Sequence, residues 1–137
     1  MGLLGCGTEV VCNTCRLCEK AGDRPMLILC TAGTDRTGDS TAFRLSVLGV
    51  ERDIIEADYL LTNIDVERQV DFLESTVGLP EGVDRELMMH HAGVPETAML
   101  DFLNGLEETH GGVLRYLTSI GIDEATMNAV RRNFLEG

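Results

Sequence analysis

The sequence is short of positive charge and of aromatic side chains. It contains no tryptophan, two tyrosines and four phenylalanines, and Lys20 is its only lysine. The 23 Asp and Glu residues outnumber the 11 Lys and Arg residues and give a formal net charge of −12 at pH 7. Because nucleic acids and anionic membrane surfaces are bound through basic patches, this charge balance argues against both as partners.

Long apolar runs are lacking as well. No stretch of the sequence approaches the length of a membrane span, and no basic segment followed by an apolar core marks a secretory signal. We therefore expect a cytoplasmic protein without a membrane span, a setting in which structural disulfides are rare. The length of 137 residues and the 44% apolar content favour one domain, residues 1–137, with a sizeable core.

Residues 26–38, Met-Leu-Ile-Leu-Cys-Thr-Ala-Gly-Thr-Asp-Arg-Thr-Gly, have the pattern of a strand, an anion-binding loop and a helix. Four apolar residues suited to a buried strand lead to Cys30, a turn leads to Arg36, and a helical pattern follows. In such a unit, backbone N–H groups and a helix N-terminus bind phosphate, and the same positive field favours a thiolate. The bare spacing of Cys30 and Arg36 is a weak signal, and Gly33 with the flanking elements supplies the necessary context.

The chemistry of the side chains suggests a role for each member of this loop. Cys30, as thiolate, is the candidate nucleophile, and Arg36 is a planar and permanently charged clamp for two phosphate oxygens. Thr37 is expected to donate its hydroxyl to the sulfur. Asp35 is either the general acid for the leaving oxygen or a carboxylate favoured by the helix dipole. The residues expected to hold the phosphate are Thr31, Ala32, Gly33, Thr34, Asp35 and Arg36.

The run from Leu29 to Gly38 resembles the HCxxGKDRTG signature of the protein tyrosine/serine phosphatases, also called lipid-phosphatase-like tyrosine phosphatases. Residues 48–63 are similar to the segment that follows this loop in the family, and residues 110–134 to its helical tail. The resemblance implies an α/β fold in which one core strand and the phosphate loop precede five to six helices. It also implies a phosphomonoester hydrolase that acts on phosphotyrosine or a related phosphorylated substrate through a phosphocysteine intermediate, with no cofactor and no metal.

Three departures from that signature bear on activity. Leu29 replaces the family's His before the nucleophile and Thr34 replaces its Lys, so we expect slow turnover and a poor fit to multiply phosphorylated inositol lipids. Only 25 residues precede the strand at 26–29, where the family has a multi-strand sheet, so the chain looks like the C-terminal half of that domain. Residues 9–12 either pair with this strand or, as we favour, begin a helix that runs to Lys20.

Two other functions stay open beside phosphate-ester hydrolysis. One is a non-catalytic phosphate-binding or interaction fragment of a phosphatase domain. The other is arsenate reduction or sulfur transfer by a similar thiol loop, which is less favoured because sulfur transfer does not specifically require Arg36 and Thr37. The expected partner is a phosphorylated protein or a small phosphomonoester, and the sequence does not fix the oligomeric state.

Cys12, Cys15 and Cys18 recur every three residues. On a helix, Val11, Cys15 and Cys18 share one face, which favours packing of small side chains in the core. Zinc or an iron–sulfur cluster is the alternative, although a fourth ligand with matching spacing is lacking. A third interpretation is redox, with one of these thiols resolving an oxidised Cys30.

Helical periodicity predicts helices over residues 36–48, 51–62, 66–77, 99–106 and 113–120 and a final helix capped by Asp123. The side chains expected on the inner faces of the third and last of these are Val66, Val70, Leu73 and Val77, and Met127, Val130 and Phe134. Asp58 beside Tyr59 is expected to hydrogen-bond the phosphate loop or the following turn. His90 and His91 are expected at the surface. Asp65, Glu67, Asp71 and Glu74 are expected to form a solvated acidic face along the helix predicted at 66–77.

Overall fold

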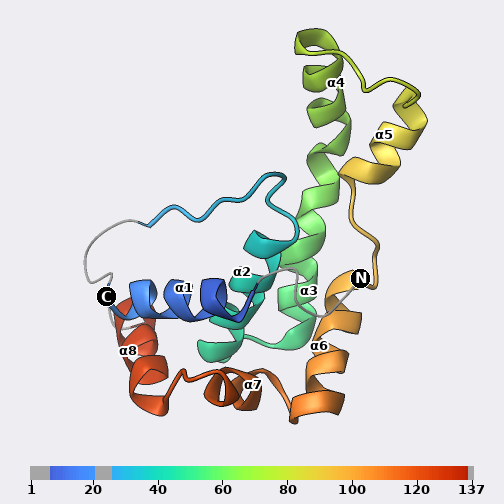
Figure 1. Cartoon of the computed structure of the whole chain (residues 1–137). Coiled ribbons are helices and arrows are strands. Elements are labelled where there is room, and N and C mark those ends of the chain that lie inside the picture. The colour runs from blue at the N-terminus through green and yellow to red at the C-terminus, as the bar shows by residue number, and fades with distance from the viewer. Residues whose placement is uncertain (1–6, 21–25, 136–137) are drawn as a thin grey trace.

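The computed structural model of the chain describes residues 7–20 and 26–135. Within these residues the fold is helical, and one extended segment leads into α2 (Figure 1). The helices are α1 (Thr8–Lys20), α2 (Arg36–Val47), α3 (Arg52–Leu60), the 3₁₀ helix η1 (Leu61–Asp65), α4 (Val66–Thr76), α5 (Arg85–Ala92), α6 (Ala98–His110), α7 (Val113–Ser119) and α8 (Glu124–Leu135). The six helices predicted after the loop are present, and α5 is an additional one that periodicity did not indicate.

The predicted core strand at residues 26–29 is wrong for the part of the chain that the structure describes. Residues 26–30 form no ladder with any described segment, and Leu27 and Leu29 are 84% and 72% exposed. A strand needs a neighbour to pair its backbone groups and cover its side chains. The candidate neighbour, residues 9–12, lies instead in α1, as we favoured. The expected α/β fold is therefore helical over the described residues.

The main core lies where α1, α2, α6, α7 and α8 meet. Phe43 of α2 is at its centre, with its ring edge-on to Phe102 at 5.6 Å and stacked on Tyr116 at 5.5 Å between centroids. The buried residues of this cluster are Val11, Cys12, Cys15, Cys18, Phe43, Val47, Leu106, Tyr116, Leu117, Ile122, Met127 and Val130. A smaller cluster joins α2, α3 and α6 through Ala42, Ile55, Met99 and Leu103. These two clusters fix α2, and with it the loop that precedes α2.

The cysteines of α1 are core residues, which confirms the packing interpretation. Cys12, Cys15 and Cys18 are all buried, and Asn133 of α8 donates to the carbonyl oxygen of Cys18 at 3.0 Å. Burial raises the pKa of Cys15 to about 11, and the neighbouring Cys18 and Cys12 add to this rise. Burial also raises the pKa of Cys18. All three buried side chains pack as small apolar groups. Among residues 7–20 and 26–135, no three His, Cys, Asp or Glu side chains are arranged to hold a metal.

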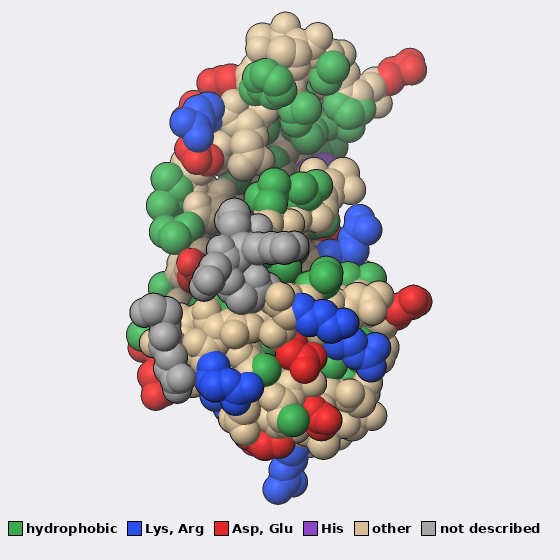
Figure 2. Space-filling model, turned by 90° about the vertical axis from the view of Figure 1, so that its left-hand side faces the viewer, with side chains coloured by type: hydrophobic (Ala, Val, Ile, Leu, Met, Phe, Trp, Pro, Cys, Tyr) green, Lys and Arg blue, Asp and Glu red, His purple; other side chains and the backbone are tan. Residues whose placement is uncertain are grey.

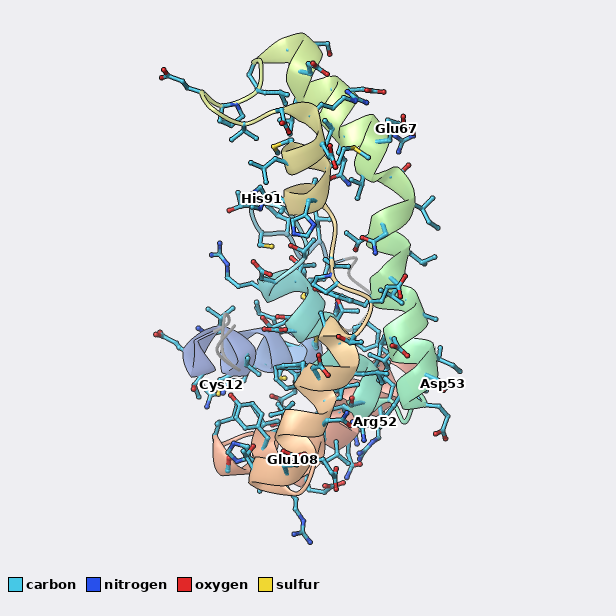
Figure 3. All side chains as sticks on the ribbon, turned by 90° about the vertical axis from the view of Figure 1, so that its right-hand side faces the viewer. Cys12, Arg52, Asp53, Glu67, His91 and Glu108 are labelled. Atoms are coloured by element: carbon cyan, nitrogen blue, oxygen red, sulfur yellow. The ribbon has the colours of Figure 1, made fainter. Side chains whose placement is uncertain are left out.

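Helices α3 and α4 are joined through η1 into one rising column, and α5 returns beside α4 to form an arm (Figures 1 and 3). Val66 and Val70 are buried as predicted, but Val77 is 78% exposed because the chain turns away at the end of α4. Hydrophobic side chains therefore show at the surface of this arm (Figure 2). No helix among the described residues is both long enough and apolar enough to cross a membrane.

Helix α5 owes its position to polar contacts, since none of its residues is buried. The Asp84 carboxylate caps it by accepting the Leu87 N–H at 2.8 Å. Arg85 bridges to α4 through Asp71 and Glu74, at 2.7 Å for the latter. The acidic face of α4 is exposed, as predicted, and it also anchors α5. His90 and His91 are exposed on α5, which confirms their surface location.

Helix α8 begins and packs largely as predicted. The Asp123 carboxylate accepts the Thr126 N–H at 2.8 Å and caps the helix. Met127 and Val130 are buried, but Phe134 is 44% exposed, so its predicted inward orientation is wrong. Phe134 instead borders a cavity of about 170 Å³ between α2 and α8, beside Leu48 and Arg44. The core covers Met127 and Val130 but does not extend to the last turn of α8.

Candidate active site

The loop between Cys30 and Arg36 lies at the N-terminal end of α2 (Figure 1). Gly33 adopts a left-handed backbone conformation with φ of +78°, which only glycine takes without strain. This conformation turns the chain back so that the Gly33 N–H donates to the Cys30 sulfur at 3.1 Å. The loop therefore presents an amide to Cys30, the predicted nucleophile.

The electrostatics of the loop favour the thiolate form of Cys30. Partial burial is the largest single influence on its pKa and raises it, but hydrogen-bond donors from Thr37, Gly33 and Ala32 together outweigh burial and lower the pKa below its usual range. The Gly33 amide meets the distance and angle of a hydrogen bond. The Thr37 hydroxyl is buried and forms no such bond with any described residue, so we attribute its influence on the sulfur to the proximity of its dipole.

Arg36 is the first residue of α2, and its side chain bends back along the loop. Its Nη2 donates to the Thr31 hydroxyl at 3.5 Å, next to Cys30 in the chain. Arg36 is exposed to solvent. The structure thus brings Arg36 and Cys30 to the same loop. Of the other predicted phosphate-binding residues, Thr31, Ala32 and Gly33 are exposed and Thr34 is half-buried.

Asp35 occupies the position just before α2 without capping it through its side chain. Its carboxylate is exposed and makes no capping hydrogen bond, whereas its carbonyl oxygen accepts the Asp39 N–H at 2.8 Å. The carboxylate is thus open to solvent beside the loop. The general-acid role of Asp35 remains a prediction, and its exposed position is compatible with it.

A pocket of about 90 Å³ adjoins the loop between α2 and α3. Gly33, Thr37 and Gly38 line one side, and Asp58 and Tyr59 line the other. The Tyr59 ring lies directly on Gly38, since a Cβ there would stand 2.7 Å from Cε2 of the ring. No hydrogen bond joins the Asp58 side chain to the loop or to the following turn among the described residues, so neither form of that expectation is met. Tyr59 provides the contact from α3.

Asp39 is a residue of this site that sequence reasoning missed. It lies half-buried in the first turns of α2, and burial, followed by the nearby Asp35 carboxylate, raises its pKa to about 6. Burial, Asp35 and Asp39 also raise the pKa of Tyr59. The sequence did contain a signal, because two carboxylates four residues apart at the start of a predicted helix must lie on one face.

A loop that directs amides at a cysteine of lowered pKa, with an arginine opening the following helix, defines a thiol-bearing anion site of the kind that cysteine-dependent phosphatases use. Comparison with known proteins agrees with this class. The sequence profile of the Tyrosine phosphatase family matches residues 8–136. The chain is also 32% identical over 125 residues to the triple specificity protein phosphatase PtpB of Mycobacterium tuberculosis (strain H37Rv). The chain belongs to the tyrosine phosphatase family.

The match to that relative covers the two proteins unequally. It takes in 81% of this chain and 44% of the mycobacterial protein. The chain therefore spans less than half the length of the curated relative it matches.

Proposed function

We propose that this protein is a phosphomonoester hydrolase that acts on phosphotyrosine or a related phosphorylated substrate through a phosphocysteine intermediate. The proposal depends on the environment of Cys30, which lies in the same loop as Arg36. Its sulfur accepts a hydrogen bond from the Gly33 N–H, and its pKa is lowered. A thiol held in this way is ionised over more of the neutral pH range, and the thiolate is the attacking form.

The chemistry proceeds in two displacements at phosphorus. In the first, the Cys30 thiolate forms a P–S bond while the P–O bond to the leaving group breaks, and Asp35 gives its proton to the leaving oxygen. In the second, Asp35 takes a proton from water, the water oxygen bonds to phosphorus, and the P–S bond breaks to return the thiolate and release inorganic phosphate. Arg36 binds two phosphoryl oxygens in both steps, and Thr37 stabilises the departing sulfur.

We infer the substrate preference from the residues around Cys30 and Arg36. The mycobacterial relative is named for triple specificity, and we propose phosphoprotein or small phosphomonoester substrates for this chain as well. Thr34 and Leu29 stand where the family signature has Lys and His. Without those groups the site has less attraction for multiple phosphates, so we propose slow turnover and weak action on polyphosphorylated inositol lipids. We place the activity in the cytoplasm, whose reducing conditions keep Cys30 as a thiol.

Turnover of p-nitrophenyl phosphate tests the proposal. Wild type should hydrolyse it, Cys30→Ser should abolish turnover, and a chelator should have no effect. Cys12→Ser is the matched control, because serine keeps a hydroxyl where the Cys12 thiol donates to the Ile120 carbonyl at 3.2 Å. Equal rates for wild type and Cys30→Ser, with both proteins folded, would reject the hydrolase.

A non-catalytic phosphate-binding fragment is the second candidate. It is favoured by segment 26–30, which pairs with no other described segment and exposes Leu27 and Leu29 to solvent just before the nucleophile. An unsupported loop of this kind would bind phosphate or vanadate without turning over an ester. Calorimetric binding of inorganic phosphate together with an absence of turnover would select this function over the first.

A further inference from the structure

Asp39 directly follows the loop motif and has no role in the proposed chemistry. It stands one helical turn beyond Asp35, and residues four apart on a helix lie on the same face. Its N–H donates to the Asp35 carbonyl oxygen at 2.8 Å, so the N-cap residue Asp35 is joined to the first turn of α2. The two carboxylates are therefore neighbours at the mouth of the phosphate loop.

The surroundings of the two carboxylates differ. Asp35 is exposed, whereas Asp39 is half-buried and close enough to Tyr59 of α3 to raise the pKa of that phenol. The titratable groups that face Asp39 are Asp35 from the loop and Tyr59 from α3. Among the described residues Asp39 forms no ion pair. A poorly solvated carboxylate beside a second negative charge holds its proton to higher pH than a solvated one.

We propose that Asp39, the inner of the two carboxylates, holds or releases a proton and so sets the charge that the loop presents to an incoming phosphate. This inference rests on the proposed function. When the proton is held, the loop presents one negative charge fewer beside Arg36, and an anionic substrate binds more tightly. When the proton is lost, the additional carboxylate repels the phosphate. Asp39 is thus a positioning residue that acts through charge and has no part in bond making.

The direction of the pH dependence follows from the raised pKa of Asp39. Its carboxyl is largely neutral below its pKa of about 6 and ionised above it. Phosphate capture by wild type should therefore weaken as the pH rises through 6. An Asp39→Asn variant keeps the shape of the side chain and stays neutral, so it should lack this component of the pH profile.

The experiment compares the KM of p-nitrophenyl phosphate for wild type and Asp39→Asn between about pH 5 and pH 8. This leaving group needs little help from a general acid, and the ionisation of the substrate itself cancels in the ratio of the two proteins. We expect the ratio of wild-type KM to variant KM to rise from near one in acid to about two- to fivefold above neutrality, with kcat little changed. A ratio that stays constant with pH would overturn the proposal.

Two controls separate charge at the site from other effects. Glu67→Gln removes one negative charge from α4, where Glu67 points outward and away from the body (Figure 3), and its KM ratio should not change with pH. Asp39→Ser is a second neutral variant, to be used if the asparagine variant loses the helical circular dichroism of the wild type. It should reproduce the same pH trend.

Failure of the proposed function gives a different result from failure of this inference. If wild type is no faster than Cys30→Ser, the hydrolase is rejected, and calorimetric binding of inorganic phosphate then tests Asp39 directly. Weaker binding above pH 6 in wild type but not in Asp39→Asn upholds the charge role. Parallel binding curves for the two proteins overturn it.

Discussion

Replacing Gly33 by alanine tests whether the backbone of the loop controls the reactivity of Cys30. Nothing lies within 4 Å of a Cβ at this position, so the substitution creates no clash. The cost is conformational, because φ is +78° and a residue with a Cβ pays roughly 1–2 kcal/mol in that region. The loop relieves this strain by rotating the Gly33 amide away from the sulfur. A hydrogen bond to a charged group contributes about 1.5–3 kcal/mol.

We take the low end of that range because Cys30 is partly exposed, which still means about tenfold less thiolate at a given pH. The pH dependence of Cys30 alkylation by iodoacetamide, followed on the peptide that contains it by mass spectrometry, should move to higher pH, and turnover should fall about tenfold with it. Gly78→Ala is the matched control, since its φ is +77° and the space around it is also open. An unchanged Cys30 profile in a folded Gly33→Ala protein would refute the reasoning.

Three other predictions concern the core, a helix cap and the loop. Phe43→Ala should lower the free energy of unfolding by about 3–5 kcal/mol in urea titrations, because Phe43 is 2% exposed at the centre of the core. The Thr126 amide holds the pKa of Asp123 below its usual range, so this cap stabilises the protein above the unfolded-state pKa and ceases to do so as the pH falls through the lower folded value. Asp123→Ala should therefore have a lower Tm than wild type at neutral pH, and the difference in Tm between the two proteins should disappear in acid. Thr34→Lys should lower the KM for inositol polyphosphates more than for p-nitrophenyl phosphate, and equal effects on both would contradict our account of the loop.

Local signals predicted most of the helical fold. Gly49, Gly78 and Asp123 mark helix ends by their own chemistry, and the structure places helix boundaries within a few residues of those predicted from them. Helix α5 was missed because its stability comes from the Arg85 contacts to α4, and such contacts carry no periodicity. Phe134 follows the apolar period of α8, yet the core ends before it. A period shows which face a residue occupies, and what covers that face depends on neighbours distant in sequence.

Some residues of the candidate site could likewise be predicted from the local sequence, and others depend on tertiary packing. The structure places Cys30, Gly33 and Arg36 in one short loop, and their roles in binding and catalysis stay predictions. Asp39 could not be recognised from the sequence, because its partial burial and the position of Tyr59 against the neighbouring Gly38 are set by tertiary packing. The contact joins α2 to α3 over about twenty residues of sequence, and only the packed structure shows it. Burial therefore changes the interpretation of a carboxylate that, from its position in a helix's first turns, looks like an ordinary dipole-stabilising residue.

The extended segment before Cys30 follows from the same physics. Four apolar residues have the composition of a buried strand, but strand formation is a property of pairs, since the hydrogen bonds of each strand are supplied by its neighbour. A helix satisfies its own backbone groups and can be predicted from one segment, whereas residues 26–29 cannot. The α2 end of the loop is held by Phe43 and Ala42 in the two core clusters, while the Cys30 end follows a segment with no ladder to any described residue. The geometry of the nucleophile consequently depends on the Gly33 amide more than it would in a loop anchored at both ends, which is why we expect Gly33→Ala to change its reactivity.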